Sequence, residues 1–203
     1  MAENPLRGRV ISRGETPASS GNVANIITVI RILLAPVFVL LLLADNGQDG
    51  ALRWVAAGLF IVAIATDGID GSIARRRNLV TNLGILLDPI ADKVLIGGAL
   101  VSLSILGELW WWVTIVILVR ELGITALRFA VLSERVIPAS KGGKLKTVMQ
   151  SVAISLFLTP LWTVVGDWVH IVNWVAMGAA LVLTVYTGVE YLHRALRAPN
   201  ARD

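Results

Sequence analysis

Six apolar runs, each close to the roughly 20 residues that an α-helix needs to cross a bilayer, constrain this chain more than any other feature. We expect the helices at about 23–44, 51–74, 82–106, 110–133, 145–165 and 169–192. The connectors between the runs are short and rich in turn residues such as Asn, Asp and Gly. The sequence therefore predicts an all-α integral membrane bundle of six transmembrane helices over residues 21–203. Residues 1–20 form a polar leader in this prediction.

The composition excludes several classes of protein. The 203 residues are 56% hydrophobic and 16% charged, and the mean hydropathy is +0.74, which is outside the usual range of soluble domains. The chain has no cysteine, so disulfides, thiolate metal sites and cysteine nucleophiles are excluded. The net charge is +4, but the basic residues are dispersed among apolar runs, so we expect no nucleic-acid partner. We expect these residues to face anionic lipid at the membrane surface.

The distribution of charge predicts how the helices are oriented. The basic clusters all fall on one side of a six-helix arrangement, and they comprise Arg7, Arg9, Arg13, Arg75, Arg76, Arg77, Arg135, Lys141, Lys144, Lys146, Arg194, Arg197 and Arg202. The other side holds acidic connectors, with Arg53 as the nearby cation. Because basic loops stay in the cytoplasm, we expect both termini to be cytoplasmic in a multi-pass protein of the inner membrane. Six tryptophans are expected at the outer interface, namely Trp110, Trp111, Trp112, Trp162, Trp168 and Trp174.

Four aspartates interrupt the apolar pattern. Asp67 and Asp70 close the second run, whereas Asp88 and Asp92 open the third. Spacings of three and four residues put each pair on one helical face, so the two helix ends can present four carboxylates to a shared point. Isolated carboxylates are costly at membrane depth, and a divalent metal is their natural occupant. The alternatives are buried ion pairs with nearby basic residues or a path for cations.

The spacing around these aspartates is also specific. Residues 66–93 contain D-x-x-D-G-x-x-A-R, eight further residues and then G-x-x-x-D-x-x-x-D, a pattern filled by Asp67, Asp70, Gly71, Ala74, Arg75, Gly84, Asp88 and Asp92. This pattern resembles that of the CDP-alcohol phosphotransferase family. The resemblance implies transfer of a phosphatidyl group from a CDP-linked lipid to an alcohol, release of CMP, and Mg²⁺ or Mn²⁺ held by the aspartates. It also implies a homodimer.

Within this pattern we expect two metal ions, because cleavage of a diphosphate requires charge neutralisation on both sides of the bond that breaks. Asp67, Asp70 and Asp88 are the expected main ligands. Asp92 is expected to contact the second metal and to act as the general base on the acceptor hydroxyl.

Four residues of the pattern are expected at the CDP-lipid. Arg75 has a bidentate guanidinium suited to a diphosphate. Gly71, Ala74 and Gly84 are small, which either leaves room for the cytidine or lets neighbouring helices approach closely, and the sequence leaves both readings open.

Three further stretches narrow the acceptor. Residues 25–36 (NIITVIRILLAP), 119–128 (VRELGITALR) and 137–150 (IPASKGGKLKTVMQ) resemble the phosphatidylglycerophosphate synthase branch of the family, whose acceptor is sn-glycerol 3-phosphate. The expected phosphate-binding residues are Arg120, Arg128, Lys144, Lys146, Thr28 and Arg31. Glu121, next to Arg120 on the same predicted helix, is expected to lie off its face.

The expected reaction therefore transfers the phosphatidyl group of CDP-diacylglycerol to sn-glycerol 3-phosphate at the cytoplasmic boundary. A sister enzyme that uses inositol phosphate, serine or another alcohol is the nearest alternative, because it would share the aspartate pattern. A non-enzymatic carrier or channel for divalent cations is the alternative from another class.

Overall fold

The computed structural model describes residues 23–76, 82–131 and 141–197 of the chain. Within these ranges it leaves undescribed the side chains of residues 23–26, 67–76, 82–86, 88, 128–131, 141, 142, 144 and 194–197. The helices are α1 (Val23–Asp45), α2 (Ala51–Arg76), α3 (Asn82–Ile105), α4 (Trp111–Val131), α5 (Lys141–Leu158), α6 (Trp162–Val165) and α7 (Val169–Arg197). These described ranges contain no strand, so the predicted all-α class is confirmed.

The fifth predicted helix, 145–165, is wrong at both ends. Helix α5 begins four residues earlier, at Lys141, and ends at Leu158. It ends there because Pro160 has no backbone N–H to donate and disfavours a helical conformation of the residue before it. The chain then forms the single turn of α6, which Gly166 ends with a φ of 104° that favours glycine.

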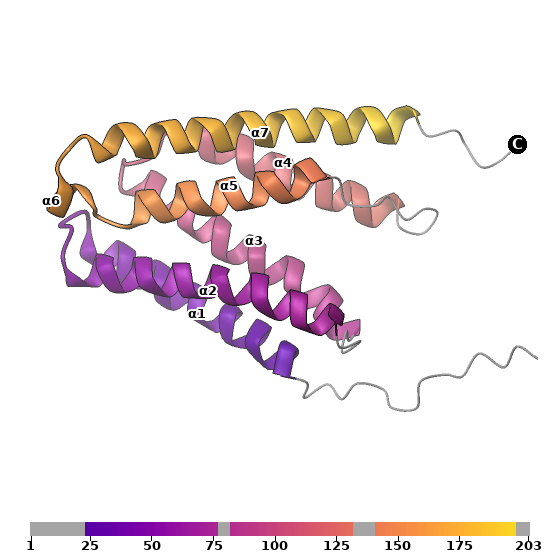
Figure 1. Cartoon of the computed structure of the whole chain (residues 1–203), viewed down its shortest axis with the longest axis horizontal. Helices are drawn as coiled ribbons and strands as arrows, with labels where there is room; N and C mark the ends of the chain where they lie inside the picture. The colour runs from indigo at the N-terminus through magenta and orange to yellow at the C-terminus, as the bar shows by residue number, and fades with distance from the viewer. Residues whose placement is uncertain (1–22, 77–81, 132–140, 198–203) are drawn as a thin grey trace, which may run out of the picture.

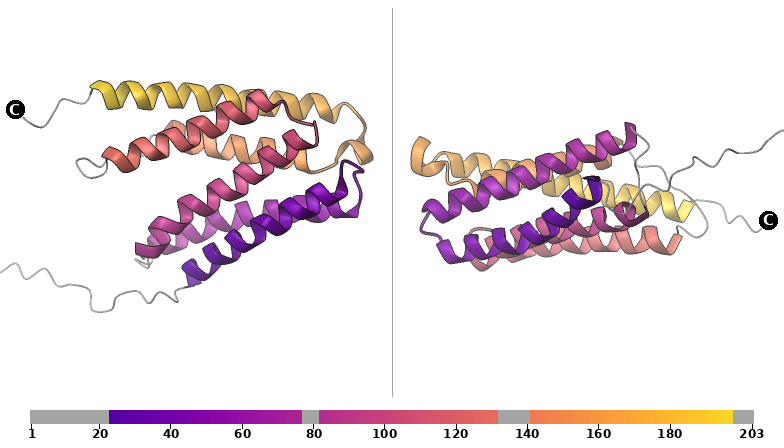
Figure 2. Two further views of the ribbon diagram at one scale, coloured as in Figure 1. Left: turned by 180° about the vertical axis from the view of Figure 1, so that it is seen from behind. Right: turned by 90° about the horizontal axis from the view of Figure 1, so that it is seen from below.

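The helices form two groups of three. Helix α1 packs against α2 and α3, and α7 packs against α4 and α5. The groups meet where α3 contacts α4 and α5 and where α2 contacts α5 (Figure 1). The views in Figure 2 show the long helices running roughly alongside one another, with α6 and the α1–α2 and α3–α4 turns at one end. The start of α1 and the end of α7 lie at the other end.

Each helix buries one apolar stripe and exposes another. In α1 the buried residues Ala35, Phe38 and Leu42 recur at spacings of three and four, whereas Leu33 and Leu40 are 63% and 67% exposed. Large exposed leucines are costly in water but are the expected surface in lipid. Two helical segments, Ile27–Asp45 and Val169–His193, are long and apolar enough to cross a membrane, and only 28% of each is buried inside the bundle.

Helices α1 and α3 approach closely at Gly98. A Cβ atom added to Gly98 would lie 2.9 Å from Cγ2 of Val39, a β-branched side chain that cannot easily rotate away. At Gly58 in α2, by contrast, an added Cβ atom would meet no atom within 4 Å. The two glycines therefore form a matched pair for testing the packing of α1 on α3.

We predict opposite effects for Gly98→Ala and Gly58→Ala. Alanine favours a helix over glycine by about 0.5–1 kcal/mol, so Gly58→Ala should stabilise the protein. At Gly98 the same gain is outweighed by a steric cost of about 1–3 kcal/mol, so the variant should be less stable than the parent. Thermal unfolding in detergent, followed by far-UV circular dichroism at one scan rate, measures both effects. An equal rise in melting temperature for the two variants would contradict the close approach.

Candidate functional site

The four aspartates of the sequence pattern lie on consecutive helices near one end of the bundle. Asp67 and Asp70 belong to the last three turns of α2, and Asp88 and Asp92 to the first three turns of α3. The end of α2 and the start of α3 lie at the same end of the bundle (Figure 1). Because both stretches are helical, the spacings keep each aspartate pair on one face. Carboxylates are the ligands that Mg²⁺ and Mn²⁺ prefer, so this donor set fits the expected metal.

Several predicted side chains at this end lie outside the described part of the structure. They are those of Asp67, Asp70, Gly71, Ala74, Arg75, Gly84 and Asp88. The side chain of Asp92 is described and is half-buried. Metal binding by the four carboxylates therefore stays a prediction.

Helix α1 is tied to the turn of α2 that precedes the first aspartate. The Nε atom of Arg31, which is buried, donates a hydrogen bond of 3.1 Å to the carbonyl oxygen of Ala63. The hydroxyl of Thr66 lies 3.0 Å from the same oxygen and 2.8 Å from the carbonyl oxygen of Val62, and it can donate to either. In an α-helix the Ala63 carbonyl also faces the N–H of residue 67, so Arg31 helps to fix the backbone that carries Asp67. Thr28, which is also buried, lies one turn before Arg31 on the same face of α1.

A second charged cluster joins α4 to α5. The Glu121 carboxylate accepts a hydrogen bond from Nη1 of Arg120 at 3.1 Å and another from the Lys146 ammonium, which is buried. Glu121 follows Arg120 directly and so lies off its face, as expected, but the long arginine side chain curves back along the helix surface and the two still form an ion pair. One carboxylate thus holds two of the predicted phosphate-binding cations.

Helix α7 completes this cluster. The second guanidinium nitrogen of Arg120, Nη2, donates to the hydroxyl of Thr187 at 2.9 Å. Gly188 lets the arginine pass, since an added Cβ atom would lie 3.1 Å from Cγ of Arg120. Two cations facing one carboxylate leave a net charge of +1 on these three side chains. The cluster is therefore suited to an anion.

The structure brings together only some of the predicted acceptor residues. Arg120 and Lys146 share Glu121, whereas the described contact of Arg31 is with α2. Arg128 lies two turns beyond Arg120 on α4, and Lys144 lies in the first turn of α5, but their side chains lie outside the described residues. The roles of Glu121 and Thr187 as partners of these cations were not predicted from the sequence. For Glu121 a signal was present, because it is an acidic residue inside an apolar run, next to the predicted site residue Arg120.

A buried arginine, Arg53, lies at the opposite end of the bundle. From the sequence it was expected only to be a cation near the acidic connectors. Arg53 is fully buried and forms two hydrogen bonds of 2.5 Å to the Glu108 carboxylate. It also contacts Asp49 at 3.3 Å and stacks on the Trp162 ring at 4.9 Å. This cluster ties the α1–α2 turn, α2, the α3–α4 turn and α6 together.

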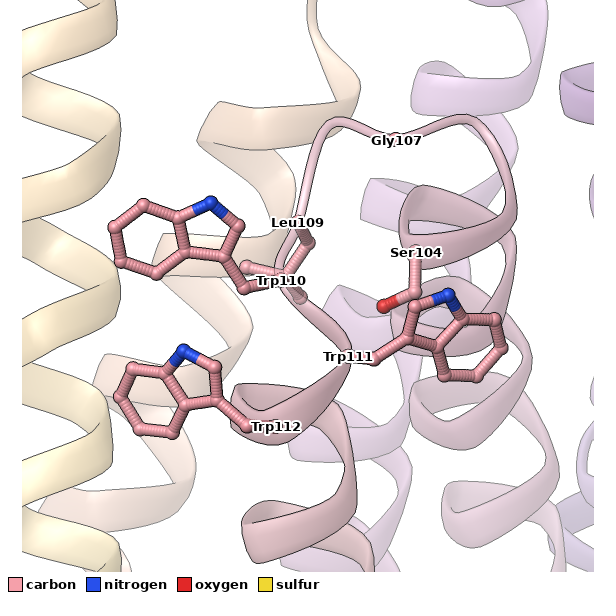
Figure 3. Close-up of a pocket in the computed structure, with 6 residues that line it drawn as sticks. All are labelled: Ser104, Gly107, Leu109, Trp110, Trp111 and Trp112. Atoms are coloured by element: carbon pink, nitrogen blue, oxygen red, sulfur yellow. The ribbon is translucent and has the colours of Figure 1, made fainter.

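Exposed tryptophans surround the same end, as predicted. Trp110, Trp111 and Trp112 line an open groove of about 670 Å³ at the α3–α4 turn (Figure 3). The ring of Trp110 also lies 4.5 Å from that of Trp174 on α7. Because the groove is open and mostly apolar, we interpret it as a surface of the interfacial kind rather than a ligand cage.

Comparison with known proteins identifies relatives over most of the chain. A family model for CDP-alcohol phosphatidyltransferase matches residues 21–186. A Mycobacterium tuberculosis protein named "Probable phosphatidylglycerophosphate synthase" is 49% identical over 97% of this chain and 90% of its own length. Proteins named CDP-diacylglycerol–glycerol-3-phosphate 3-phosphatidyltransferase are also similar. The Bacillus subtilis protein is 36% identical over 88% of this chain and 99% of its own length. The Shigella flexneri protein is 37% identical over 86% of this chain and 94% of its own length.

We predict that Glu121 and Lys146 are energetically coupled. Glu121→Gln alone removes the charge that balances two cations, and it should destabilise the protein by about 1–3 kcal/mol. In a double-mutant cycle with Lys146→Gln, the coupling energy should be about 0.5–3 kcal/mol, measured by thermal unfolding in detergent. The control is Thr147→Ala with Glu121→Gln, because Thr147 is exposed and its hydroxyl donates to the carbonyl of Gly143 within α5. Additive effects of the Glu121 and Lys146 substitutions would contradict the ion pair.

Proposed function

Because the chain belongs to the CDP-alcohol phosphatidyltransferase family, we propose that it transfers the phosphatidyl group of CDP-diacylglycerol to sn-glycerol 3-phosphate, giving phosphatidylglycerophosphate and CMP. The relatives named for this reaction cover most of the chain, including the aspartate pattern and the basic stretches that follow it. The enzyme class is therefore that of a transferase in phospholipid synthesis.

One structural observation supports this reaction most strongly. The ends of α2 and α3 that carry the aspartates, and the net-positive cluster of Arg120, Glu121 and Lys146, belong to helices that pack together through contacts of α3 with α4 and α5. A reaction between a diphosphate lipid and a phosphorylated alcohol needs both a carboxylate metal site and an anion site. In our proposal the aspartates serve as the metal site and the net-positive cluster as the anion site.

The proposed chemistry begins with the primary hydroxyl of glycerol 3-phosphate. Asp92 accepts the hydroxyl proton, and the oxygen attacks the lipid-side phosphorus of CDP-diacylglycerol. The bond from that phosphorus to the bridging oxygen breaks, and CMP leaves with the bond's electron pair. Asp67, Asp70, Asp88 and Asp92 would hold two Mg²⁺ or Mn²⁺ ions, which would supply the positive charge that neutralises the diphosphate. We assign Arg75 to the diphosphate, and Gly71, Ala74 and Gly84 to the border of the nucleotide.

The acceptor phosphate is assigned to the positive cluster. Arg120 and Lys146 bear two positive charges against the one negative charge of Glu121, so a phosphate can restore neutrality there. We assign Arg128 and Lys144 to the same phosphate-binding site. Thr28 and Arg31 border it from α1 in our proposal, with Arg31 also holding α2 in place.

We place the site at the cytoplasmic face of the inner membrane. The six long helices cross the bilayer in this proposal, with residues 1–20 as a cytoplasmic leader and residues 21–203 as the catalytic domain. The acidic connectors and exposed tryptophans lie at the end opposite the aspartates, which agrees with an outward-facing interface there. Acyl chains then stay in lipid while glycerol 3-phosphate enters from water. The family resemblance further leads us to propose a homodimer.

The reaction is tested by CMP release from CDP-diacylglycerol in detergent. We expect release with glycerol 3-phosphate and Mg²⁺ or Mn²⁺, and none after chelation. Asp92→Ala should lower kcat by at least about 10²-fold, the usual contribution of a general base, while far-UV circular dichroism stays unchanged. Unaltered turnover in this variant would remove Asp92 from its role. Release with inositol phosphate alone would favour the sister enzyme, and metal flux into proteoliposomes without CMP would favour a carrier.

The acceptor site is tested by Arg120→Gln. Loss of one charge-assisted hydrogen bond to phosphate, worth about 1.5–3 kcal/mol, should raise the KM for glycerol 3-phosphate by about 10–100-fold. The KM for CDP-diacylglycerol should change little. Glycerol, used as a poor acceptor without a phosphate, is the matched control, because parent and variant should then react alike. Equal losses with both acceptors would mean that Arg120 acts on the fold and does not bind the phosphate.

A further inference from the structure

A cavity of about 340 Å³ lies at the α6 end of the bundle, far from the aspartate end. Its lining includes Asp49 from the α1–α2 turn, Glu108 from the α3–α4 turn, Trp162 from α6 and Asn173 from α7. Two turns and two helices therefore converge on a polar space that the proposed phosphatidyl transfer does not use.

The arginine behind this cavity has no donor left for an anion. Its Nε atom donates to the carbonyl of Leu158 at 3.1 Å, and Nη2 donates to the carbonyl of Phe157 at 2.8 Å. Both Nη atoms donate to Glu108, and Nη1 also contacts Asp49. Arg53 is fully buried, and these hydrogen bonds engage four of the five N–H groups of its guanidinium, while Nη1 also lies 3.3 Å from the Asp49 carboxylate.

Hydrogen-bond acceptors, in contrast, remain open toward the cavity. The side chains of Asp49 and Glu108 are 26% and 24% exposed, and each carboxylate can accept more hydrogen bonds than Arg53 and Trp162 supply. Asn173 is only 1% exposed, and its Oδ1 atom has no hydrogen-bond partner. Two carboxylates facing one guanidinium leave a net charge of −1. No lysine or arginine is among the described residues that line the cavity, and its other titratable lining residue is His170, whose ring lies 4.7 Å from that of Trp162.

The residues that line the cavity suit an organic cation better than a metal ion. No three carboxylate or imidazole groups among the described residues are close enough to hold a metal ion, and Ca²⁺ or Mg²⁺ would need about six oxygen ligands. Aromatic rings form much of the wall, including Trp162, Trp174 and Phe157, and such surfaces suit organic cations. The volume is at the small end of the roughly 300–1,000 Å³ typical of ligand pockets.

We propose that this cavity binds a primary organic ammonium group, held by the carboxylates of Asp49 and Glu108 and by Oδ1 of Asn173. The same chemistry is offered by the headgroup of an aminophospholipid and by a small soluble amine. Exposed tryptophans at this end are the residues found at the depth of lipid headgroups, so both sources have access. This proposal does not depend on the reaction at the other end.

The test uses the full chain labelled with ¹⁵N in its indole groups, in detergent micelles, observed by two-dimensional NMR. The indole N–H of Trp162 donates to Asp49 at 2.8 Å, so it reports directly on the site. Trp111 does not line the cavity and serves as an internal control. The probes are ethanolamine, MgCl₂, and nanodiscs of phosphatidylglycerol with or without phosphatidylethanolamine.

We expect ethanolamine or phosphatidylethanolamine to shift the Trp162 and Trp174 resonances in a saturable way while Trp111 stays constant. Asp49→Asn removes the net negative charge of the site, and Asn173→Leu removes its amide acceptor. Each variant should bind the ammonium about tenfold more weakly, because it loses one charge-assisted hydrogen bond. Gln48→Ala, an exposed residue of the same turn that does not line the cavity, should change nothing. CMP release should stay at the parent level in all three variants.

A response to only one of the two amine probes would identify the source of the ammonium and support the site. A saturable response to MgCl₂ with none to either amine would overturn it, as would the absence of any saturable shift. Binding that is unchanged in both Asp49→Asn and Asn173→Leu would likewise overturn the assignment, because two independent contacts would then contribute nothing.

Discussion

Charged side chains buried between apolar helices are the constraint on which the rest of this structure depends. A charge in such surroundings is tolerated only with a partner, and here the partners come from other helices or turns. Glu108 in the α3–α4 turn forms an ion pair with Arg53 of α2, and Lys146 of α5 forms one with Glu121 of α4. These pairs tie together elements that lie far apart along the chain, whereas the apolar stripes around them are compatible with many arrangements.

The same pairs give the two ends of the bundle opposite character. Near the aspartate end, two cations share one carboxylate, so the described cluster retains a positive charge. At the α6 end, two carboxylates share Arg53, so a negative charge is retained. An enzyme that joins a lipid diphosphate to a phosphorylated alcohol needs its positive field where both anions meet, and the proposed acceptor site has this field. The retained negative charge at the other end is the basis of the proposed ammonium site.

Much of the fold could be predicted from local patterns. Apolar runs and turn residues located the long helices to within a few residues, because hydrophobic periodicity and chain breakers act locally. The fifth helix was misplaced, although Pro160 was a visible signal, because the apolar run continues past it. The aspartate pattern identified the family correctly, since its eight identities at fixed spacing reflect chemistry and do not depend on how the helices pack.

The sequence by itself determined the helices, their apolar character, the family and the candidate carboxylates, because each of these is encoded in residues close together along the chain. Only the tertiary structure decided that Glu121 holds Arg120 and Lys146, that Thr187 and Gly188 of α7 accommodate the arginine, and that Arg31 bonds to α2. Most of these contacts join residues about 25 or more positions apart. Their partners depend on how helices pack across the bundle, and neither spacing nor propensity along one helix contains that information.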